Sequence, residues 1–373
     1  MYSIWEKNSF TEFDCIIIGS GILGLSTAIS IKEKSPDTDV LILERGSLPS
    51  GASTKNAGFA CFGSLTEILS DIKRVGEDET VSLVEKRWIG VNMLRQRLGD
   101  ERMGYLNYGG YELIQSDHID SIGRISYVND LLRNIFNSDT FLEDKNRISE
   151  FGFNKSIVES LVFSPCESQI DTGVMMRSLI AMAQSRGVMI INNFDAQIEN
   201  DSDENIAVYS EGTDVRFKAK KLISCSNAFT TKLLPNMIIK PGRGQVIATR
   251  PIAGLPFKGV FHIDEGYYYF RNFGERVIFG GGRNLDFEGE QTGEFGTTEK
   301  IISTLTSILG DVILPGKKFE IEMKWSGIMG FNDSKLPEIT KISDNITAGF
   351  CCNGMGVALA SYVAESLSES GIS

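Results

Sequence analysis

The sequence predicts a mixed α/β fold in which a Rossmann-like domain is interleaved with a second, β-rich domain. Residues 14–44 contain, in order, a strand, a glycine turn, a helix, a strand and an acid, as in a nucleotide-binding βαβ unit. A second glycine turn opens an apolar helix near residue 354, and strand-rich segments lie between the two turns. The length of 373 residues agrees with about two domains.

The segment 14–44 predicts a site for a dinucleotide. The apolar strand 14–18 leads into Gly19-Ser20-Gly21-Ile22-Leu23-Gly24, and a helix follows. Gly19 permits a tight turn, Gly21 allows the backbone to approach a pyrophosphate, and Gly24 allows helix and strand to pack closely. The helix N-terminus offers unpaired N–H groups to phosphate oxygens. Glu44 ends the second strand, 40–43, where a carboxylate can accept hydrogen bonds from a ribose.

The remaining elements follow from apolar periodicity and turn residues. The small-residue segment 46–58 is typical of a flexible loop, and residues 105–114 predict a hairpin or strand pair. Predicted helices cover 79–98, 172–186 and 299–309. Predicted strands cover 188–191, 207–209, 215–218, 221–225, 241–247, 267–271 and 277–279, and a strand and helix at 346–367 close the chain. We expect residues 1–78, 150–238 and 324–373 to form the cofactor domain, and 79–149 and 239–323 the substrate domain.

Composition excludes several classes of protein. A formal net charge of −12 argues against a nucleic-acid partner or an anionic membrane surface, because both attract basic proteins. The sequence shows no secretory leader and no membrane-spanning run, which predicts a cytoplasmic protein without an integral membrane segment. Six cysteines without CxxC spacing, and two histidines, predict no metal site. We expect the adjacent Cys351 and Cys352 to be reduced rather than joined in a vicinal disulfide.

The opening motif occurs with both FAD and NAD, and two further segments favour FAD. Residues 50–58 follow the ribose-binding acid closely, where a long cofactor needs a cradle of small residues rich in N–H groups. The second glycine turn, Asn353-Gly354-Met355-Gly356, opens a helix whose N-terminus can face a flavin edge that becomes negative on reduction. An NAD-dependent dehydrogenase is therefore disfavoured.

Taken together, these motifs resemble the D-amino-acid oxidase family of FAD-dependent oxidoreductases, which includes glycine oxidase, sarcosine oxidase and gamma-glutamylputrescine oxidase. The resemblance covers almost the full length. It is carried by Gly19–Gly24 with Glu44 and Arg45, Gly51–Gly58, Ile170-Asp171, Ile223–Ala228, Trp325-Ser326-Gly327 with Asp333 and Pro337, and Asn353–Gly356.

The resemblance implies that non-covalent FAD oxidises the carbon–nitrogen bond of a small amine or amino acid. A hydride passes to flavin N5, the resulting imine hydrolyses, and oxygen or a quinone accepts the electrons. The implied cofactor-binding residues are Gly19, Gly21, Ile22, Leu23, Gly24, Glu44, Arg45, Gly51, Ala52, Ser53, Thr54, Asn56, Ala57, Gly58, Phe59, Gly327, Asn353, Gly354, Met355 and Gly356.

The substrate pocket departs from the family pattern at one position. Many relatives carry an arginine two residues after the Trp-x-Gly block, where it binds the substrate carboxylate, and this chain has Met329 there. Other cations offer replacements, and the candidates are Lys55, Arg243, Arg271 and Arg283. Tyr267 and Tyr269 share one face of a predicted strand, opposite Tyr268, and one face is expected to line the pocket, with Tyr269 a candidate.

Two alternatives remain open from the sequence. The first is an FAD-dependent 2-hydroxy-acid dehydrogenase, which needs a base to remove the hydroxyl proton, and His262 is the candidate for that base. The second is a non-catalytic flavin-binding module, because fold alone does not determine function.

Overall fold

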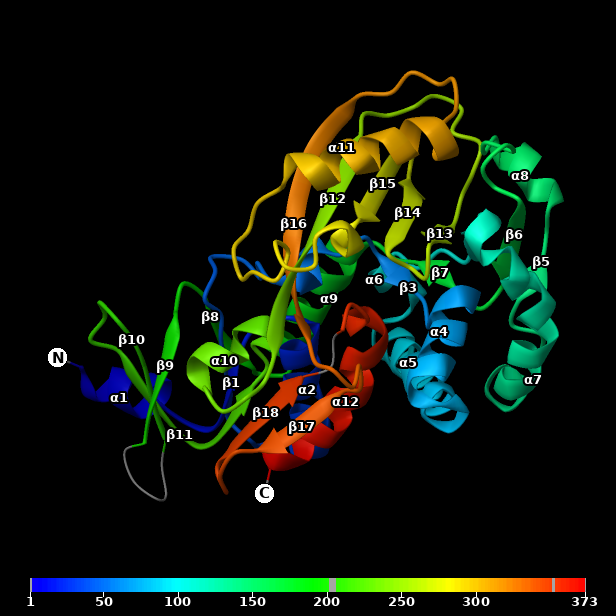
Figure 1. The fold of residues 1–373 in the computed structure, drawn as a ribbon. Coiled ribbons are helices and arrows are strands. Elements are labelled where there is room, and N and C mark those ends of the chain that lie inside the picture. Colours follow the sequence, from blue (N-terminus) through cyan, green and yellow to red (C-terminus); the bar gives the residue numbers. More distant parts are fainter. Residues whose placement is uncertain (1, 201–205, 351–352, 373) are drawn as a thin grey trace.

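The computed structural model describes residues 2–200, 206–350 and 353–372. The chain folds around two eight-stranded sheets, joined by a small ladder of β3 (Phe59–Ala60) and β7 (Ser168–Gln169). The predicted mixed α/β fold is therefore confirmed (Figure 1). The expectation for Cys351 and Cys352 lies outside the described residues.

The first sheet contains the predicted βαβ unit. Its strands run in the order β17-β18-β11-β1-β2-β8, with β10 beside β11 and β9 beside β10. The bounds are β1 (Glu12–Ile18), β2 (Val40–Leu43), β8 (Met189–Ile191), β9 (Ala196–Asn200), β10 (Ile206–Ser210), β11 (Arg216–Ser224), β17 (Glu338–Lys341) and β18 (Ile346–Phe350). β1 pairs in parallel with β2 and β11, and all four residues of β2 are buried, as expected for a strand covered on both faces.

Helices cover one face of this sheet and strands cover the other. The helices are α2 (Ile22–Lys34), α5 (Glu77–Leu98), α9 (Thr172–Ser185) and α12 (Gly356–Ser370), and they share one apolar core with Cys15 and Ile17 of β1. On the opposite face, Ile16 and Ile18 pack against apolar side chains of β9, β10 and β11. The alternation of side chains along β1 thus divides its residues between two cores.

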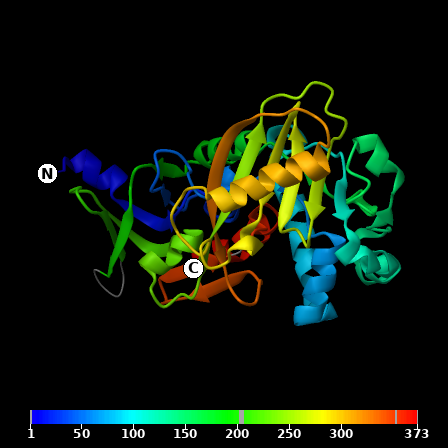
Figure 2. The ribbon, with the colours of Figure 1, turned by 45° about the horizontal axis from the view of Figure 1, so that its top comes forward.

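The second sheet has the order β16-β12-β15-β14-β13-β4-β6-β5. Its bounds are β4 (Gly110–Ile114), β5 (Leu142–Glu143), β6 (Ser160–Ser164), β12 (Lys240–Thr249), β13 (Val260–Ile263), β14 (Tyr268–Phe273), β15 (Arg276–Gly281) and β16 (Ile321–Phe331). Helix α11 (Glu299–Ile308) lies across it (Figure 2). The helix and the sheet pack around a cluster of phenylalanines. A π-helical turn, Leu309–Ile313, continues α11.

Short elements complete the described chain. The remaining α-helices are α1 (Ile4–Phe10), α3 (Ala52–Lys55), α4 (Leu65–Val75), α6 (Asp100–Met103), α7 (Ile125–Phe136), α8 (Asn146–Phe151) and α10 (Thr230–Leu233). Three 3-10 helices lie at Ser116–Arg124, Asn227–Phe229 and Arg283–Leu285. None of the helices in the described part of the chain combines the length and apolar character that crossing a bilayer requires.

Three local predictions need correction. Residues 105–114 contain one strand, β4 (Gly110–Ile114), rather than a hairpin, because the partners of β4, β13 and β6, come from distant parts of the chain. The segments 215–218 and 221–225 belong to one continuous strand, β11. The small-residue segment 46–58 contains the helix α3.

The domain division stays a proposal, and strand membership suggests different boundaries. β6 and β16 belong to the second sheet. The sequence instead assigns β6 and most of β16 to the cofactor domain. Helix α5 packs on α12 and contributes to the core of the first sheet, although the sequence assigns residues 79–98 to the substrate domain. The apolar pattern of a helix does not indicate which of two domains the helix packs against.

Candidate active site

A cavity of about 640 Å³ begins where β1 and β2 end and extends to the second sheet. Ile18, Gly19, Leu43 and Glu44 line it at the carboxyl ends of these parallel strands. This edge of an open α/β sheet is where ligands bind in such folds. The cavity is long enough to be lined by residues of both sheets and of α3 and α12.

The glycine turn after β1 has the geometry that close helix–strand packing requires. Gly19 has φ +105°, and a Cβ added to Gly24 would overlap the carbonyl oxygen of Gly19. Gly24 is absent from the cavity lining, so its contribution is packing. Gly21, Ile22 and Leu23 line the cavity at the N-terminus of α2, where backbone N–H groups without an intrahelical partner are placed to bind a phosphate.

Glu44 is held in place at the end of β2 by three hydrogen bonds. Its Oε2 accepts from the N–H and the hydroxyl of Ser20, at 3.1 and 2.7 Å, and its Oε1 accepts from the N–H of Gly46 at 2.9 Å. The residue is only 8% exposed and lines the cavity. Each carboxylate oxygen accepts about two hydrogen bonds, so Oε1 keeps capacity for a ribose hydroxyl. The adjacent Arg45 also lines the cavity, and its Cζ lies 4.1 Å from the ring centroid of Phe229.

The segment around α3 forms a wall between the two sheets. Ser53 Oγ accepts a hydrogen bond from the N–H of Ile22 at 2.9 Å, which leaves its hydroxyl proton for an anionic group. The indole N–H of Trp325 donates to the carbonyl of Lys55 at 2.9 Å. A Cβ on Gly327 would lie 2.9 Å from Cβ of Lys55, so glycine allows β16 to pack directly on α3.

Most of the predicted cofactor-binding residues in this wall line the cavity. Those that do are Gly51, Ala52, Ser53, Asn56, Ala57, Phe59 and Gly327. Thr54 and Gly58 do not line it. The hydroxyl of Thr54 donates to the carbonyl of Pro49 at 2.6 Å, and the N–H of Gly58 donates to Asn56 Oδ1 at 2.9 Å, so both shape the loop from behind.

A second helix N-terminus reaches the cavity from the end of the chain. Asn353, Gly354, Met355 and Gly356 line it where α12 begins. No side chain among the described residues caps this helix, so its first N–H groups face the cavity. These features fit the parts of FAD. The helix N-termini suit the pyrophosphate and the flavin ring, the acid at the end of β2 suits the ribose, and the wall of small residues leaves room for the cofactor.

The second sheet lines the remaining end of the cavity with aromatic side chains. Tyr267 and Tyr269 line it, whereas Tyr268 packs into the core under α11, which identifies the face of the tyrosine run that the sequence left open. The ring of Phe59 contacts those of Tyr269 and His262, with centroids 5.8 and 5.4 Å apart. Burial raises the pKa of Tyr269 to about 12, so the phenol stays neutral. Lys55 also lines the cavity.

Two predicted substrate contacts are engaged elsewhere. The guanidinium of Arg271 donates to the carbonyls of Gly58, Ile170 and Asn272 at 2.8, 2.5 and 2.9 Å, and burial lowers its pKa to about 10. Arg243 makes a two-point ion pair with Glu290, at 2.8 Å for each hydrogen bond. Neither arginine lines the cavity, so we withdraw both as substrate contacts. The sequence identifies both residues as cations, but it does not show which groups they bind in the fold.

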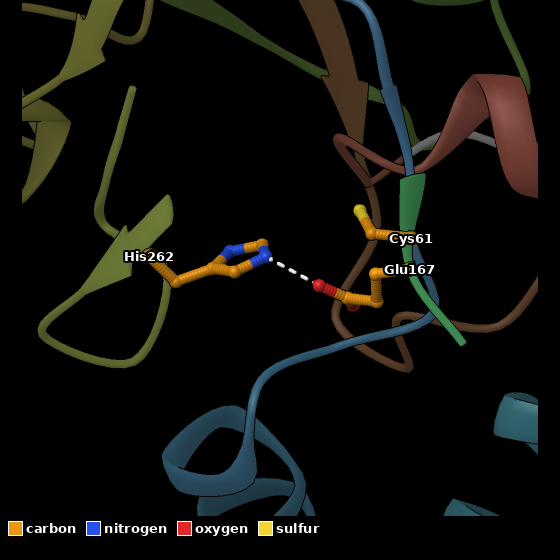
Figure 3. A group of neighbouring side chains, drawn as sticks. All are labelled: Cys61, Glu167 and His262. Carbon is orange, nitrogen blue, oxygen red and sulfur yellow. Dashed lines mark hydrogen bonds and ion pairs between the residues drawn. The ribbon is translucent and has the colours of Figure 1, made fainter. Parts of the chain in front are cut away.

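His262, Glu167 and Cys61 lie together beside the aromatic end of the cavity (Figure 3). His262 Nε2 lies 2.9 Å from a carboxylate oxygen of Glu167, and His262 and Cys61 line the cavity. Burial lowers the pKa of His262, but the charges of Glu167 and Glu112 outweigh it and the net pKa is raised. The neighbouring carboxylates therefore favour the charged form of His262, in which Nε2–H donates to Glu167.

The same burial keeps Cys61 uncharged. It raises the pKa of the Cys61 thiol well above its ordinary value, and Glu167 adds to this effect. Thiol, carboxylate and imidazole groups also bind metals, but here the imidazole nitrogen and the carboxylate are already joined by a hydrogen bond. We interpret the three residues as a hydrogen-bonded group, and the absence of a metal stays a prediction.

Several lining residues carry no sequence signal. Phe194, Asp195, Ala196 and Gln197 reach the cavity because the N–H of Glu44 donates to the carbonyl of Ile191 and draws the start of β9 alongside. Phe229, Phe287 and Phe331 line it from three separate segments of the chain. Glu167, the partner of His262, precedes β7, and only the folded ladder β3–β7 brings it near Cys61.

The fold and the cavity define a dinucleotide-binding oxidoreductase. The family model described as FAD dependent oxidoreductase (DAO) matches residues 14–370, and the chain belongs to this family. The chain is therefore an FAD-dependent oxidoreductase. This membership also answers the choice between FAD and NAD that the first motif left open.

Individual relatives are distant. L-2-hydroxyglutarate dehydrogenase of Escherichia coli (strain K12) is 23% identical over 252 residues, which are 64% of this chain. The chain matches about half of that protein's length, 54%. L-proline dehydrogenase from P. horikoshii has a TM-score of 0.77 at 15% identity, covering 96% of this chain and 93% of that one. Glycine oxidase from Geobacillus kaustophilus also has 0.77, at 16% identity over 97% and 95%. At such identity, the likeness shows the fold alone.

Proposed function

We propose that this enzyme oxidises the carbon–nitrogen bond of a small amine or amino acid by hydride transfer to flavin N5, giving an imine that water hydrolyses. The observation that carries the proposal is the environment of His262, which lines the substrate end of the cavity, lies 2.9 Å from a carboxylate oxygen of Glu167 and has its pKa raised by nearby carboxylates. A raised pKa favours the protonated imidazole, which is no base. The neutral form of an amine has no proton that must leave before hydride transfer, whereas oxidation of a hydroxyl group needs a base beside it.

The chain's own residues would bind the cofactor and exclude water. The N-termini of α2 and α12, Ser53 and Glu44 are placed for its anionic and polar groups. Phe59, Tyr267 and Tyr269 form an aromatic wall for the substrate, and a neutral Tyr269 phenol can donate a hydrogen bond. A site of this kind works by orientation and charge placement, while the flavin carries the redox chemistry.

A 2-hydroxy-acid dehydrogenase is the second candidate, favoured by one observation. His262 and Glu167 have the arrangement of a base oriented by a carboxylate, with the imidazole facing the cavity. One relative is named L-2-hydroxyglutarate dehydrogenase. This reaction requires a neutral imidazole, which the two nearby carboxylates disfavour. Family membership favours either enzyme over the non-catalytic flavin-binding module.

The experiment is an anaerobic titration of the FAD-loaded enzyme with amines, D- and L-amino acids and 2-hydroxy acids. We expect bleaching of the visible flavin band by an amine or amino acid, both in the wild type and in His262→Gln, which keeps a hydrogen-bonding group beside Glu167. Bleaching by hydroxy acids alone, lost in His262→Gln, would replace the proposal with the second candidate.

Three further features remain proposals with partial support. Oxygen or a quinone would reoxidise the flavin, and mixing the reduced enzyme with either one decides between them. The raised pKa of Cys61 makes its thiol a poor nucleophile and supports non-covalent FAD. Cys15, Cys61 and Cys166 are free thiols, which supports a reducing, cytoplasmic location.

A further inference from the structure

Met329 occupies the position where an arginine would bind a substrate carboxylate. It lies on β16, lines the cavity and is the register partner of Gly242 on β12. A Cβ on the next cavity-facing glycine, Gly244, would lie 2.8 Å from Met329 Cε, so the methionine side chain lies across that glycine. An apolar side chain here leaves the carboxylate of an amino acid without a partner from β16.

Arg283 approaches the same strand pair from another element. It begins the 3-10 helix that follows β15, and it lines the cavity. Its Nε lies 3.1 Å from where a Cβ on Gly242 would be, and that Cβ would also overlap the ring of Phe331. The guanidinium carbon lies 3.9 Å from the ring centroid of Phe331 and 5.2 Å from that of Phe287. Glycine at position 242 therefore provides the space in which Arg283 stacks on Phe331.

The guanidinium of Arg283 stacks on aromatic rings but has no hydrogen-bond acceptor among the described residues. Its Nε is buried without a hydrogen-bond acceptor, and the part of the chain that the structure describes gives it no ion pair. Arg243 and Arg271, by contrast, are fully engaged with Glu290 and with backbone carbonyls. A buried donor without an acceptor is unfavourable, and stacking on an aromatic ring fixes its plane. Such a group is prepared for an acceptor that arrives with a ligand.

We infer that Arg283 binds the carboxylate of the substrate in place of the arginine that Met329 replaces. The inference rests on the proposed function and narrows its substrate to amines that carry a carboxylate, such as amino acids. The two Nη groups would donate to the two carboxylate oxygens in the paired geometry that arginine favours. Arg283 is then a specificity-determining residue, with no part in moving the hydride.

The test uses benzoate as an anionic probe and benzyl alcohol as its neutral counterpart, with the FAD-loaded enzyme and the visible flavin spectrum as readout. Arg283→Met should weaken benzoate binding about tenfold to a hundredfold, because hydrogen bonds to a charged group are lost. Arg283→Lys, which keeps the charge without the fork, should fall between. Benzyl alcohol should bind all variants alike.

A matched control is Arg250→Met, which removes an exposed arginine paired with Glu320 at 3.0 Å outside the cavity. It should bind benzoate like the wild type. Equal benzoate affinity in Arg283→Met and in the wild type would overturn the inference.

Failure of the inference is distinguishable from failure of the proposed function. If amines still bleach the flavin while benzoate binds wild type and Arg283→Met equally, the assignment of Arg283 as the carboxylate site is wrong and the proposed amine oxidation is still supported. If benzoate binding depends on Arg283 while no amine or amino acid bleaches the flavin, the carboxylate site is supported and the proposed reaction is wrong.

Discussion

At the scale of residues, the protonation state of His262 decides between amine oxidation and 2-hydroxy-acid oxidation. Glu167 is its hydrogen-bond partner, and the carboxylates of Glu112 and Glu67 also favour its charged form. Glu112 is itself held by the hydroxyls of Ser64 and Thr66, and burial raises its pKa. The network contains more carboxylates than cations, which is the physical reason why the pKa of this buried imidazole is raised.

The state of His262 predicts a pH dependence of stability. Its pKa in the folded protein is raised above 6.5, so the stabilisation from its charge is fully present below pH 6.5 and is lost as the pH rises through the folded pKa. In urea titrations of the FAD-loaded enzyme, the stability advantage of the wild type over His262→Gln should shrink as the pH rises from 6.5. An advantage that stays constant or grows would mean a neutral imidazole.

Single residues were predictable where the backbone dictates their type. The roles of Gly19 and Gly24 follow from a turn and a close helix–strand contact that admit no side chain, and such demands leave a sequence pattern. The roles of Arg243 and Arg271 were not predictable, because Glu290 and the carbonyls of Gly58 and Ile170 become neighbours only in the fold. Arg283 differs from both because its buried Nε has no hydrogen-bond acceptor, and only the folded structure shows this.

At the scale of elements, the contact between α5 and α12 positions the second helix N-terminus at the cavity. Gly90 of α5 faces α12, and a Cβ there would overlap the carbonyl oxygen of Ala358 and lie 3.3 Å from Cβ of Tyr362. This glycine permits the two helices to approach closely, and α12 begins at Gly356, which lines the cavity.

Gly90→Ala should therefore destabilise the protein and weaken FAD binding. Alanine in a helix is ordinarily better than glycine, but overpacking typically costs about 1–3 kcal/mol and moves the neighbouring helix. Urea titration and FAD titration of the apoprotein measure the two effects. Gly123→Ala, at a helical glycine with nothing within 4 Å, is the matched control and should change stability by less than about 0.5 kcal/mol. Equal behaviour of the two variants would contradict the close packing of α5 on α12.

Elements were predictable where the sequence pattern is local. The strands and helix of 14–44 and the helices at 172–186 and 299–309 carry their own periodicity, and the structure has all of them within a few residues. The segment 105–114 was mistaken for a hairpin because its glycines resemble a turn, while its true partners lie more than 40 residues away along the chain.

At the scale of the whole molecule, the cavity is lined by residues of both large sheets and of α3. The first sheet supplies the glycine turn and Glu44, and the second supplies the aromatic wall and Arg283. The sequence predicted the first half because nucleotide binding follows one compact chain segment. It left the substrate half open because that half gathers residues from β3, β13, β14 and the segment after β15.

The most direct measurement of the central claim is a single turnover without oxygen, stopped in acid. A donor that bleaches the flavin is mixed with the enzyme, the precipitated protein is removed, and the supernatant is assayed for FAD and for ammonia or a smaller amine. The account predicts about one FAD per chain and about one amine released for each flavin reduced, since the flavin takes one hydride per carbon–nitrogen bond oxidised. Flavin reduction without release of an amine, or a supernatant without FAD, would contradict it.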